Sequence, residues 1–475
     1  MSKSTNSGAL TTLIFIFFFW GFVAASNDIL IPVFKKALDL SQLQSQLISF
    51  AFYVAYTVGS LLYFGISAAL RQDILNKIGY RNGLALGLII SAVGTLLFIP
   101  ASDNESFILL ISGLFIVGLG FSLQQIAANP LAIQMGDPSK GNMRLSLAGG
   151  VNNVGTTLGP VVVSFAIFGG VGSGTELELS SVKVPYMVLG GAFLLAALIF
   201  KYSSIPDRID NGGDADEGAG SILETIKHPQ VYLGMIAIFV YVGVEVATAS
   251  NLPEFMKQKL GTQESDVAPY VSLFWASLMI GRWTSASGAF DLKESTKIKL
   301  SLLLPFIAFG IFAFVNVLSG QSIDQFYPYL LIVITLVAAD AISEGKPARQ
   351  LLIYSILGSV ALIIGILSSG MISVLAFISV GLFCSTLWPC IFTLGIAGLG
   401  KNTNTASSLL IMMIMGGGFI SLLQGALADD SVLGIQNSYV VGIGCFIYLA
   451  FFAWYIAKNL KKQGVSIDEP VEAGH

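Results

Sequence analysis

The chain has 475 residues, of which 54% are hydrophobic and only 11% are charged, and its mean hydropathy is +0.79. A soluble domain carries about 25% charged residues, so this chain has too few charges to cover a water-facing surface. The net charge of −4 gives no electrostatic footprint for a nucleic-acid partner. The 33 Phe and 15 Tyr exclude a disordered chain. These figures predict an all-α protein that crosses a lipid bilayer many times.

Fourteen apolar runs are long enough to cross a bilayer, because a membrane-spanning helix needs roughly 20 apolar residues. A β-barrel is disfavoured, since barrel strands are about 10 residues of alternating pattern and these runs are continuous. The first run lacks a small-residue cleavage site, and we expect it to remain as a span. The runs have approximate bounds of 10–32, 43–70, 79–100, 106–127, 144–169, 184–203, 229–256, 267–290, 298–318, 326–344, 348–369, 371–398, 405–427 and 436–458.

The basic residues predict the orientation of the chain. With the N-terminus in the cytoplasm, 18 of the 24 Lys and Arg residues fall on cytoplasmic segments and 5 on the opposite side. This bias places both termini in the cytoplasm. Asp340 and Glu344, at the inner end of the tenth run, are expected to be hydrated residues of the interface.

An acidic segment divides the chain into two parts. Residues 204–224 are rich in Asp, Glu and Gly, a composition that cannot form a packed core. We therefore predict an N-terminal six-helix bundle (1–203), a cytoplasmic linker (204–224), a C-terminal bundle (225–461) and a cytoplasmic tail (462–475).

The first helix of each half carries the same three residues before a proline. Ala25–Asn27 precede Pro32 in the first half, and Ala249–Asn251 precede Pro253 in the second. Parallel repeats of this kind are common in secondary transporters, which hold their substrate between the halves near the midplane of the bilayer.

Two further prolines, Pro130 and Pro389, stand inside predicted spans. A proline has no N–H, so it frees the carbonyl of the residue four positions earlier. Membrane proteins tolerate this where a cavity or a neighbouring group satisfies the freed carbonyl.

Two acids, Asp28 and Glu245, lie within apolar runs. A charge deep in a span costs at least about 2.5–3.5 kcal/mol on insertion scales, so such residues are functional candidates. We expect both carboxyls to face a central cavity and to carry the coupling ion, either H⁺ or Na⁺. The alternative is that either acid lies near the outer interface and is merely hydrated.

Side-chain amides and aromatic rings are the predicted substrate-binding groups. Amides both donate and accept hydrogen bonds, which suits the hydroxyls of a sugar, although amides in spans also form bonds between helices. The aromatic candidates could stack on a sugar ring or serve only as packing and interface anchors. The candidate set is Asn27, Asp28, Gln124, Gln125, Asn129, Asn152, Asn251, Trp275 and Trp388.

The sequence shows no pattern for an enzyme or a cofactor. With only two histidines, His228 and His475, a His-based metal site or Ser-His-Asp triad in the membrane is excluded. The Gly-rich run 395–402 has Asn402 where a phosphate-binding loop has Ser or Thr, and it follows a span rather than a strand. We expect no catalytic residue, metal or cofactor.

Six segments, in order, resemble the fucose/glucose–galactose branch of the major facilitator superfamily. They are NDILIPVFKKAL, LQQIAANPLAI, RLSLAGGVNNVG, YVGVEVATASNLPEF, STLWPCIFTLGIAGLG and MMIMGGGFISLLQG. The resemblance covers both halves. It implies the major facilitator fold, with two pseudo-symmetric six-helix bundles, alternating access and sugar uptake coupled to an ion gradient across the bacterial inner membrane.

The resemblance also assigns individual residues. Asp28 matches a first-helix acid that fucose-type members use for substrate binding and proton coupling, and Asn152 matches a cavity asparagine of the fifth helix. The fourth-helix glutamate of those members falls on Gln125 here, and Glu245 stands where they have an uncharged amide. The combination of Gln125 with Glu245 is similar to the glucose/galactose type.

One segment has no counterpart in the usual twelve-helix pattern. Residues 292–345 supply two extra spans, at about 298–344, between the family's eighth and ninth helices, and we expect them to pack at the periphery. The leading hypothesis is a monomeric importer of a neutral hexose, such as glucose or galactose, by H⁺ or Na⁺ symport. N-acetylglucosamine or fucose as substrate, a sugar sensor without flux, and a drug/proton antiporter of the same fold remain open.

Overall fold

The computed structural model of this chain is entirely helical in the residues that it describes, which are 7–38, 42–70, 72–136, 140–168, 183–208, 222–262, 264–286, 293–318 and 320–465. Side chains are described for these residues except 7, 24–37, 42–49, 160–168, 264–266, 268 and 294. In chain order the helices are α1 (Ser7–Ala37), α2 (Gln42–Leu70), α3 (Ile74–Ile78), α4 (Tyr80–Leu96), α5 (Phe98–Asp103), α6 (Phe107–Gln134), α7 (Gly141–Phe168), α8 (Lys183–Lys201), α9 (Ile222–Thr225), α10 (Pro229–Leu260), α11 (Glu264–Ala286), α12 (Glu294–Leu318), η3 (Asp324–Phe326), α13 (Tyr329–Ser343), α14 (Pro347–Leu367), α15 (Gly370–Cys384), α16 (Leu387–Ile396), η4 (Gly400–Asn402), α17 (Thr403–Met412), η5 (Met413–Met415), α18 (Gly416–Leu427), α19 (Gly434–Asn437) and α20 (Val440–Lys462).

Each of the fourteen predicted runs coincides with a helix or with a broken pair of helices. Within the described residues, eleven helices are long and apolar enough to cross a membrane. The runs not among these eleven are α1, whose apolar described stretch is Gly8–Val23, together with α7 and α11. In α7 the segment GGVNNVGTT lowers the hydropathy, and in α11 Pro269 and Arg282 interrupt it. The count of fourteen spans therefore stays a prediction.

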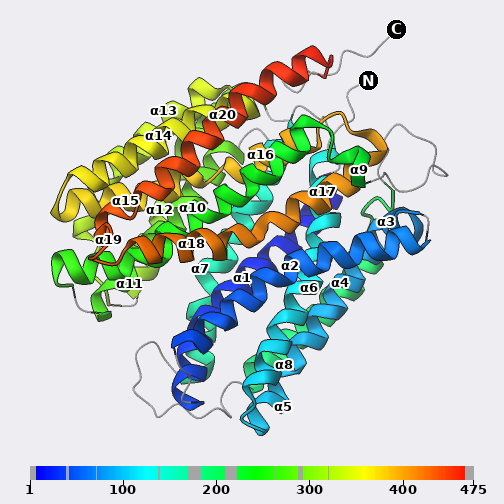
Figure 1. Ribbon diagram of the computed structural model, residues 1–475, viewed down its shortest axis with the longest axis horizontal. Helices are drawn as coiled ribbons and strands as arrows, with labels where there is room; N and C mark the ends of the chain where they lie inside the picture. Colours follow the sequence, from blue (N-terminus) through cyan, green and yellow to red (C-terminus); the bar gives the residue numbers. More distant parts are fainter. Residues whose placement is uncertain are drawn as a thin grey trace.

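The helices form two bundles, and the same kinds of pair meet in both (Figure 1). In the N-terminal bundle α1 packs on α7, α2 on α6, and α4 on α6 and α8. In the C-terminal bundle α10 packs on α18, α11 on α15, and α14 on α15 and α20. Contacts between the bundles run from α11 to α7 and from α17 to α2 and α6. The bundles lie close at the end that carries α3 and α9 and diverge toward α5 and α19.

Glycines permit the closest of these helix approaches. A Cβ added to Gly21 of α1 would lie 1.9 Å from the carbonyl oxygen of Asn152 in α7, and one added to Gly155 would lie 2.2 Å from the carbonyl oxygen of Phe18. Only a hydrogen fits at either position. The contact fixes α7 against α1 and so determines where Asn152 points.

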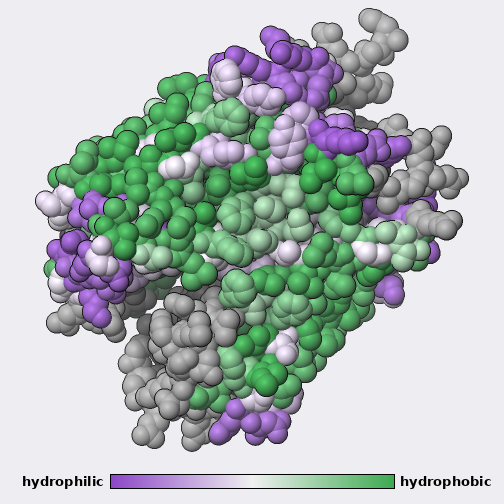
Figure 2. Space-filling view, viewed as in Figure 1, coloured by the Kyte–Doolittle hydropathy of each residue, from purple (hydrophilic) through white to green (hydrophobic). Residues whose placement is uncertain are grey.

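The surface supports a position in a membrane. Figure 2 shows a belt of hydrophobic residues between two hydrophilic ends. Large apolar side chains are exposed on many of the helices, more than water would tolerate. They include Leu62, Val93, Leu195, Phe314, Leu331 and Ile447.

The extra helices α12 and α13 pack on α11, α14 and α15 of the C-terminal bundle. Glu344, at their inner end, is exposed and pairs with Lys346 and Arg349 at 2.7 and 2.9 Å. Asp340 differs from our expectation of a hydrated residue. Its Oδ1 accepts a 2.9 Å hydrogen bond from Gln350 Nε2, so this carboxyl ties α13 to α14.

Candidate functional site

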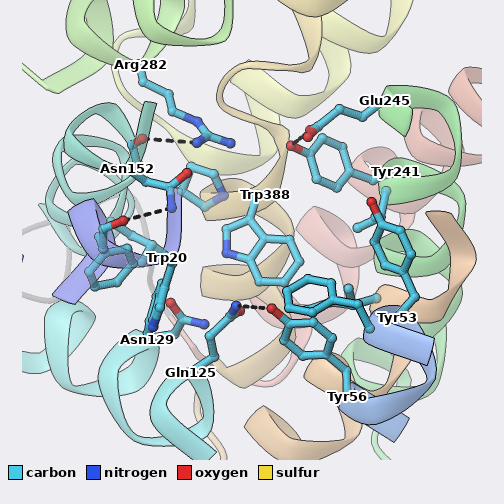
Figure 3. Close-up of a pocket in the computed structure, with 17 residues that line it drawn as sticks. Trp20, Tyr53, Tyr56, Gln125, Asn129, Asn152, Tyr241, Glu245, Arg282 and Trp388 are labelled. Carbon is cyan, nitrogen blue, oxygen red and sulfur yellow. Dashed lines mark hydrogen bonds between the residues drawn. The ribbon is translucent and has the colours of Figure 1, made fainter. Parts of the chain in front are cut away.

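A cavity of about 200 Å³ lies where the two bundles meet. It is smaller than the roughly 300–1,000 Å³ of pockets for drug-sized ligands, so it suits a small molecule. Aromatic rings, amides and one pair of opposite charges face it from both bundles (Figure 3). Its lining residues are Phe17, Trp20, Phe52, Tyr53, Tyr56, Gln125, Asn129, Leu145, Gly149, Asn152, Tyr241, Val242, Glu245, Arg282, Trp388, Pro389 and Ile414.

The N-terminal bundle contributes a wall of neutral polar groups. Asn152 of α7 donates to the carbonyl oxygen of Phe17 in α1 at 2.8 Å, which fixes the orientation of its amide. Gln125 of α6 donates to the hydroxyl of Tyr56 in α2 at 3.2 Å. In both bonds the amide nitrogen is the donor, which leaves the amide oxygen as an acceptor that can face a ligand. Both residues therefore combine a fixed position with a group suited to binding.

Asn129 is the most unusual residue of this wall. It is 1% exposed, and neither Oδ1 nor Nδ2 has a hydrogen-bond partner. Leaving a buried polar group unsatisfied costs about 1–3 kcal/mol, so a fold keeps such a group where something else binds it. Asn129 lines the cavity, and its amide offers two donors and an acceptor to an occupant.

The C-terminal bundle contributes charge and aromatic surface. The Glu245 carboxylate on α10 accepts a hydrogen bond from Tyr241, one helical turn earlier. Arg282 of α11 faces the same cavity, with its guanidinium opposite Glu245 (Figure 3). Trp388 lies between the two walls, with its ring centroid 6.2 Å from that of Tyr241. An aromatic face beside hydrogen-bonding groups is a surface on which a sugar ring can lie.

Pro130 breaks the N-terminal wall directly after Asn129. Because Pro130 has no N–H, the carbonyl of Ile126 loses its helical donor. The hydroxyl of Ser407, on α17 of the other bundle, donates to this carbonyl at 3.2 Å. The sequence left open whether a cavity or a neighbouring group satisfies the freed carbonyl, and in the structure it is a neighbouring hydroxyl.

Pro389 has the same effect in the C-terminal wall, where it lies in the first turn of α16. The carbonyl that it frees is that of Ser385, and Nε of Arg282 donates to it at 2.8 Å. The freed carbonyl therefore anchors Arg282, the one cationic side chain among the described residues that line the cavity, and it does so from within the same bundle.

The structure brings together five of the predicted residues, namely Gln125, Asn129, Asn152, Glu245 and Trp388. Asn27 and Asp28 belong to α1, but their side chains lie outside the described part of the chain.

Three predicted residues lie away from the cavity lining. The amide of Gln124 points into the N-terminal bundle, where it accepts from Trp20 Nε1 at 2.8 Å and donates to Ser91 at 3.0 Å. Asn251 donates to the carbonyl of Ala247 in its own helix at 2.8 Å. Trp275 is not among the lining residues, and its ring packs edge-on against Phe274. None of the three lines the cavity in this structure.

Sequence reasoning did not assign roles to Arg282 and Tyr241. Arg282 lies near the inner end of its span, where a basic residue is common, and this position hid its role. The signal was present, however, because an arginine within a span is as costly as an acid. Tyr241 stands four residues before Glu245, the spacing that places two side chains on the same helix face.

Hydrogen bonds join the bundles on the side that the charge bias assigns to the cytoplasm. Tyr80, at the start of α4, donates to Asn404 of α17. Asn142, at the start of α7, donates to the carbonyl of Gly345 at 3.2 Å. These two bonds hold the starts of N-terminal helices against the C-terminal bundle.

Nearer the middle of the bilayer, Thr57 of α2 donates to the carbonyl of Met412 at 3.1 Å, and Arg282 and Ser407 also bond across the interface. The described residues contain no group of three or more His, Cys, Asp or Glu that could hold a metal.

Fold and cavity define a polytopic membrane protein with a polar site between two helical bundles. The family model described as Major Facilitator Superfamily matches residues 12–345. The chain belongs to the Major Facilitator Superfamily.

Relatives extend over nearly the whole chain. A glucose/galactose transporter of Brucella abortus is 32% identical over 463 residues, 96% of each chain. The L-fucose-proton symporter of Escherichia coli is 26% identical over 460 residues, 92% of this chain and 90% of that one. The crystal structure of a Major Facilitator Superfamily transporter, FucP, in the outward conformation has a TM-score of 0.72 at 24% identity, covering 94% of this chain and 98% of that one. The two share a fold.

Proposed function

We propose that this protein imports a neutral hexose of the glucose or galactose kind by cation symport with alternating access. The observation that carries the proposal is the buried amide of Asn129, which has no partner and lines a cavity of sugar size. The names of the relatives, glucose/galactose transporter and L-fucose-proton symporter, support the substrate class.

The binding site combines the two walls. Asn129, Gln125 and Asn152 bind hydroxyls of the sugar, and Trp388 packs against one face of the ring. No chemistry is done on the sugar. Hydroxyls that leave water need replacement hydrogen bonds, and amides in fixed positions supply them.

Glu245 carries the coupling ion, together with Asp28. Binding of H⁺ or Na⁺ neutralises the Glu245 carboxylate, and this shifts the balance between outward-open and inward-open states. The matched helix pairs of the two bundles support the two-repeat architecture that such rocking requires.

The conformation is one that is closed toward the cytoplasm. The cross-bundle bonds of Tyr80, Asn142, Arg282 and Ser407 lie at the starts or inner halves of helices that the charge bias assigns to the cytoplasmic side. This arrangement is the state in which a symporter takes up its ligands from outside. With this orientation both termini lie in the cytoplasm.

Radiolabelled glucose uptake into proteoliposomes tests the proposal. We expect accumulation under an inward gradient of one ion, H⁺ or Na⁺, and not under the other. Glu245→Gln should abolish accumulation but preserve exchange of labelled for unlabelled sugar. The matched control is Glu254→Gln, which removes an exposed carboxylate from the same helix and should leave accumulation unchanged.

A matched pair of amides tests the sugar site. Asn129→Ala should weaken sugar binding about tenfold or more, since each hydrogen bond contributes about 0.5–1.5 kcal/mol. Asn251→Ala, which removes an amide bonded within its own helix, should not. Competition by lipophilic cations, with no competition by sugars, would instead identify a drug/proton antiporter and contradict the proposal.

A further inference from the structure

Arg282 bridges the two bundles while it remains anchored to its own. Its Nε donates to the carbonyl of Ser385, the carbonyl that Pro389 frees. Its Nη1 donates across the interface to the carbonyl of Gly149 at 3.1 Å and to Oδ1 of Asn153 at 2.8 Å, both on α7. The side chain is 9% exposed, so its charge is held almost entirely by protein groups.

The surface of α7 is shaped to receive this guanidinium. A Cβ on Gly149 would lie 3.1 Å from Cδ and Nη1 of Arg282, and a Cβ on Gly150 would lie 2.6 Å from the ring of Trp283. Two adjacent glycines therefore let Arg282 and Trp283 of α11 lie flat on the backbone of α7. The contact belongs to the state in which the cytoplasmic side is closed.

Opening that side separates α7 from α11 and removes two of the three acceptors of Arg282. A buried charge without a partner is strongly destabilising, so the guanidinium needs a replacement. Glu245 lines the same cavity, and among the described lining residues Glu245 and Arg282 are the two charged groups. Tyr241 on its own helix donates a hydrogen bond to the carboxylate, and Cys384 of α15 is a further titratable group near it in the described part of the chain.

We propose that Arg282 exchanges partners during transport, from Gly149 and Asn153 of α7 in the outward-open state to the Glu245 carboxylate in the inward-open state. Arg282 is thus a positioning residue for ion coupling. This inference rests on the proposed role of Glu245.

The exchange would give the carrier a different affinity for the ion on each side. While the guanidinium of Arg282 is hydrogen-bonded to α7, it does not form an ion pair with the Glu245 carboxylate. The carboxylate then binds a cation that enters from the outside. Once Arg282 turns to Glu245, the opposite charge favours the carboxylate, and the ion leaves on the cytoplasmic side. Linkage is reciprocal, so the bound ion in turn favours the closed cytoplasmic side until sugar binding offsets that preference.

Arg282→Gln tests the inference in proteoliposomes. Under an ion gradient we expect sugar accumulation to fall at least about fivefold, the low end of coupling free energies between sites, while sugar exchange persists. The pH dependence of sugar binding, measured with radiolabelled glucose at equilibrium, should flatten. Arg282→Lys, which keeps the charge, should restore part of the accumulation. The matched control is Arg349→Gln, an exposed arginine that pairs with Glu344.

A cysteine-labelling assay reports whether the cytoplasmic side of the protein is closed or open. The three native cysteines are buried, so a single Asn142→Cys should be the reactive site for an impermeant maleimide added from the cytoplasmic face. Because this substitution itself removes the bond to Gly345, Asn142→Cys alone sets the baseline rate for every comparison. Arg282→Gln and, separately, Asn153→Ala should increase its labelling rate, because each removes part of the contact between α11 and α7. Asn153→Ala leaves the charge in place and keeps the test valid if Arg282→Gln does not fold.

The outcomes separate the two proposals. If Glu245→Gln accumulates sugar normally, the coupling role of Glu245 fails and this inference fails with it. If Glu245→Gln loses accumulation but Arg282→Gln keeps it, with an unchanged pH profile and unchanged labelling, only the inference is overturned. The double variant Glu245→Gln/Arg282→Gln should behave like Glu245→Gln alone, because both residues act on one exchange.

Discussion

The two walls of the cavity are each built around a proline, and they satisfy the freed carbonyl in different ways. In the N-terminal bundle the carbonyl of Ile126 is met by a hydroxyl from the opposite bundle, that of Ser407. In the C-terminal bundle the carbonyl of Ser385 is met by the guanidinium of Arg282, which comes from the same bundle. The carbonyl freed by Pro130 therefore accepts a neutral hydrogen bond across the interface. The carbonyl freed by Pro389 holds a charged side chain beside the interface.

The difference assigns different tasks to the two bundles. A neutral hydrogen bond contributes about 0.5–1.5 kcal/mol and one to a charged group about 1.5–3 kcal/mol. The bond of Ser407 must break whenever the bundles separate, and a weak bond suits that use. The bond between Arg282 and Ser385 lies within one bundle and can persist through the cycle. The N-terminal wall is suited to bind the sugar and the C-terminal wall to hold the coupling charge.

Replacing each proline by alanine restores the missing backbone N–H, and this change has the largest expected effect on the comparison of the two walls. Pro389→Ala supplies an N–H that competes with Arg282 for the carbonyl of Ser385. We expect loss of ion-coupled accumulation by about tenfold or more, as the loss of a charge-assisted bond implies. Pro130→Ala displaces only the hydroxyl of Ser407 and should lower accumulation about threefold or less. Initial rates of uptake and of exchange in proteoliposomes measure both.

Equal losses in the two proline variants would contradict the division of tasks. Circular dichroism and thermal unfolding of the purified variants provide the control, since an alanine in either helix is expected to maintain or increase helicity.

Gln124 and Gln125 provide a further test of the N-terminal wall. They are adjacent in sequence, but the amide of Gln124 points into the bundle and Gln125 lines the cavity. Gln124→Ala leaves Trp20 Nε1 without an acceptor and should destabilise the fold by about 1–3 kcal/mol, with sugar affinity in the surviving protein unchanged. Gln125→Ala should do the reverse, weakening sugar affinity and sparing stability. Thermal unfolding and equilibrium sugar binding separate the two effects. Weaker sugar binding in Gln124→Ala at unchanged stability would contradict this assignment.

These neighbours also show how far a sequence carries the prediction. Fourteen runs of apolar residues were enough to predict the helices. The division of the chain at residues 204–224 stays a prediction, since most of that segment lies outside the described residues. The cavity faces of α6 and α10 were predicted through Asn129 and Glu245, because a strongly polar group inside a span is costly in lipid and turns toward the interior of the bundle or a water-filled cavity.

The choice between Gln124 and Gln125 could not be made in that way. Both lie in LQQIAANP, and only the rotation of α6 against α2 and α4 determines which amide enters the cavity. Arg282 was missed for a related reason, since its three acceptors are backbone and side-chain oxygens on α7 and at the break before α16, far away in sequence. Tertiary contacts of this kind leave no local pattern.

The neutral hydrogen bonds across the interface provide a test with a smaller expected effect. Ser407→Ala removes the bond to the carbonyl of Ile126, and we expect the closed cytoplasmic side to lose about 0.5–1.5 kcal/mol. The labelling rate at Asn142→Cys should rise by at most about tenfold, with the ion dependence of uptake unchanged. Arg282→Gln, in contrast, should change both. An altered ion dependence in Ser407→Ala would show that charge and gate are not separable in this way.

The smallest expected effect compares the cytoplasmic ends of the two bundles. In the N-terminal bundle Arg81 pairs with Asp207 at 2.5 Å, and the hydrogen bond from Arg81 lowers the pKa of the Asp207 carboxyl. In the C-terminal bundle the hydrogen bond from Lys346, followed by that from Arg349, lowers the pKa of Glu344, whose side chain is 56% exposed. Exposed pairs contribute little, because water and salt screen them.

Asp207→Asn should therefore lower the melting temperature only slightly, and only where the carboxylate is ionised. Because the folded-state pKa is lowered, the stabilisation is fully present above the ordinary Asp value of 3.8 and is lost as the pH falls through the lowered pKa. The difference in melting temperature between the protein and this variant should be constant near neutral pH and should shrink in acid.

Glu344→Gln should show a smaller difference in melting temperature, since the partners of Glu344 are only two and five residues away in sequence. A larger effect at Glu344 would indicate that the loop between α13 and α14, where Asn142 binds the carbonyl of Gly345, depends on this charge to keep the cytoplasmic side closed.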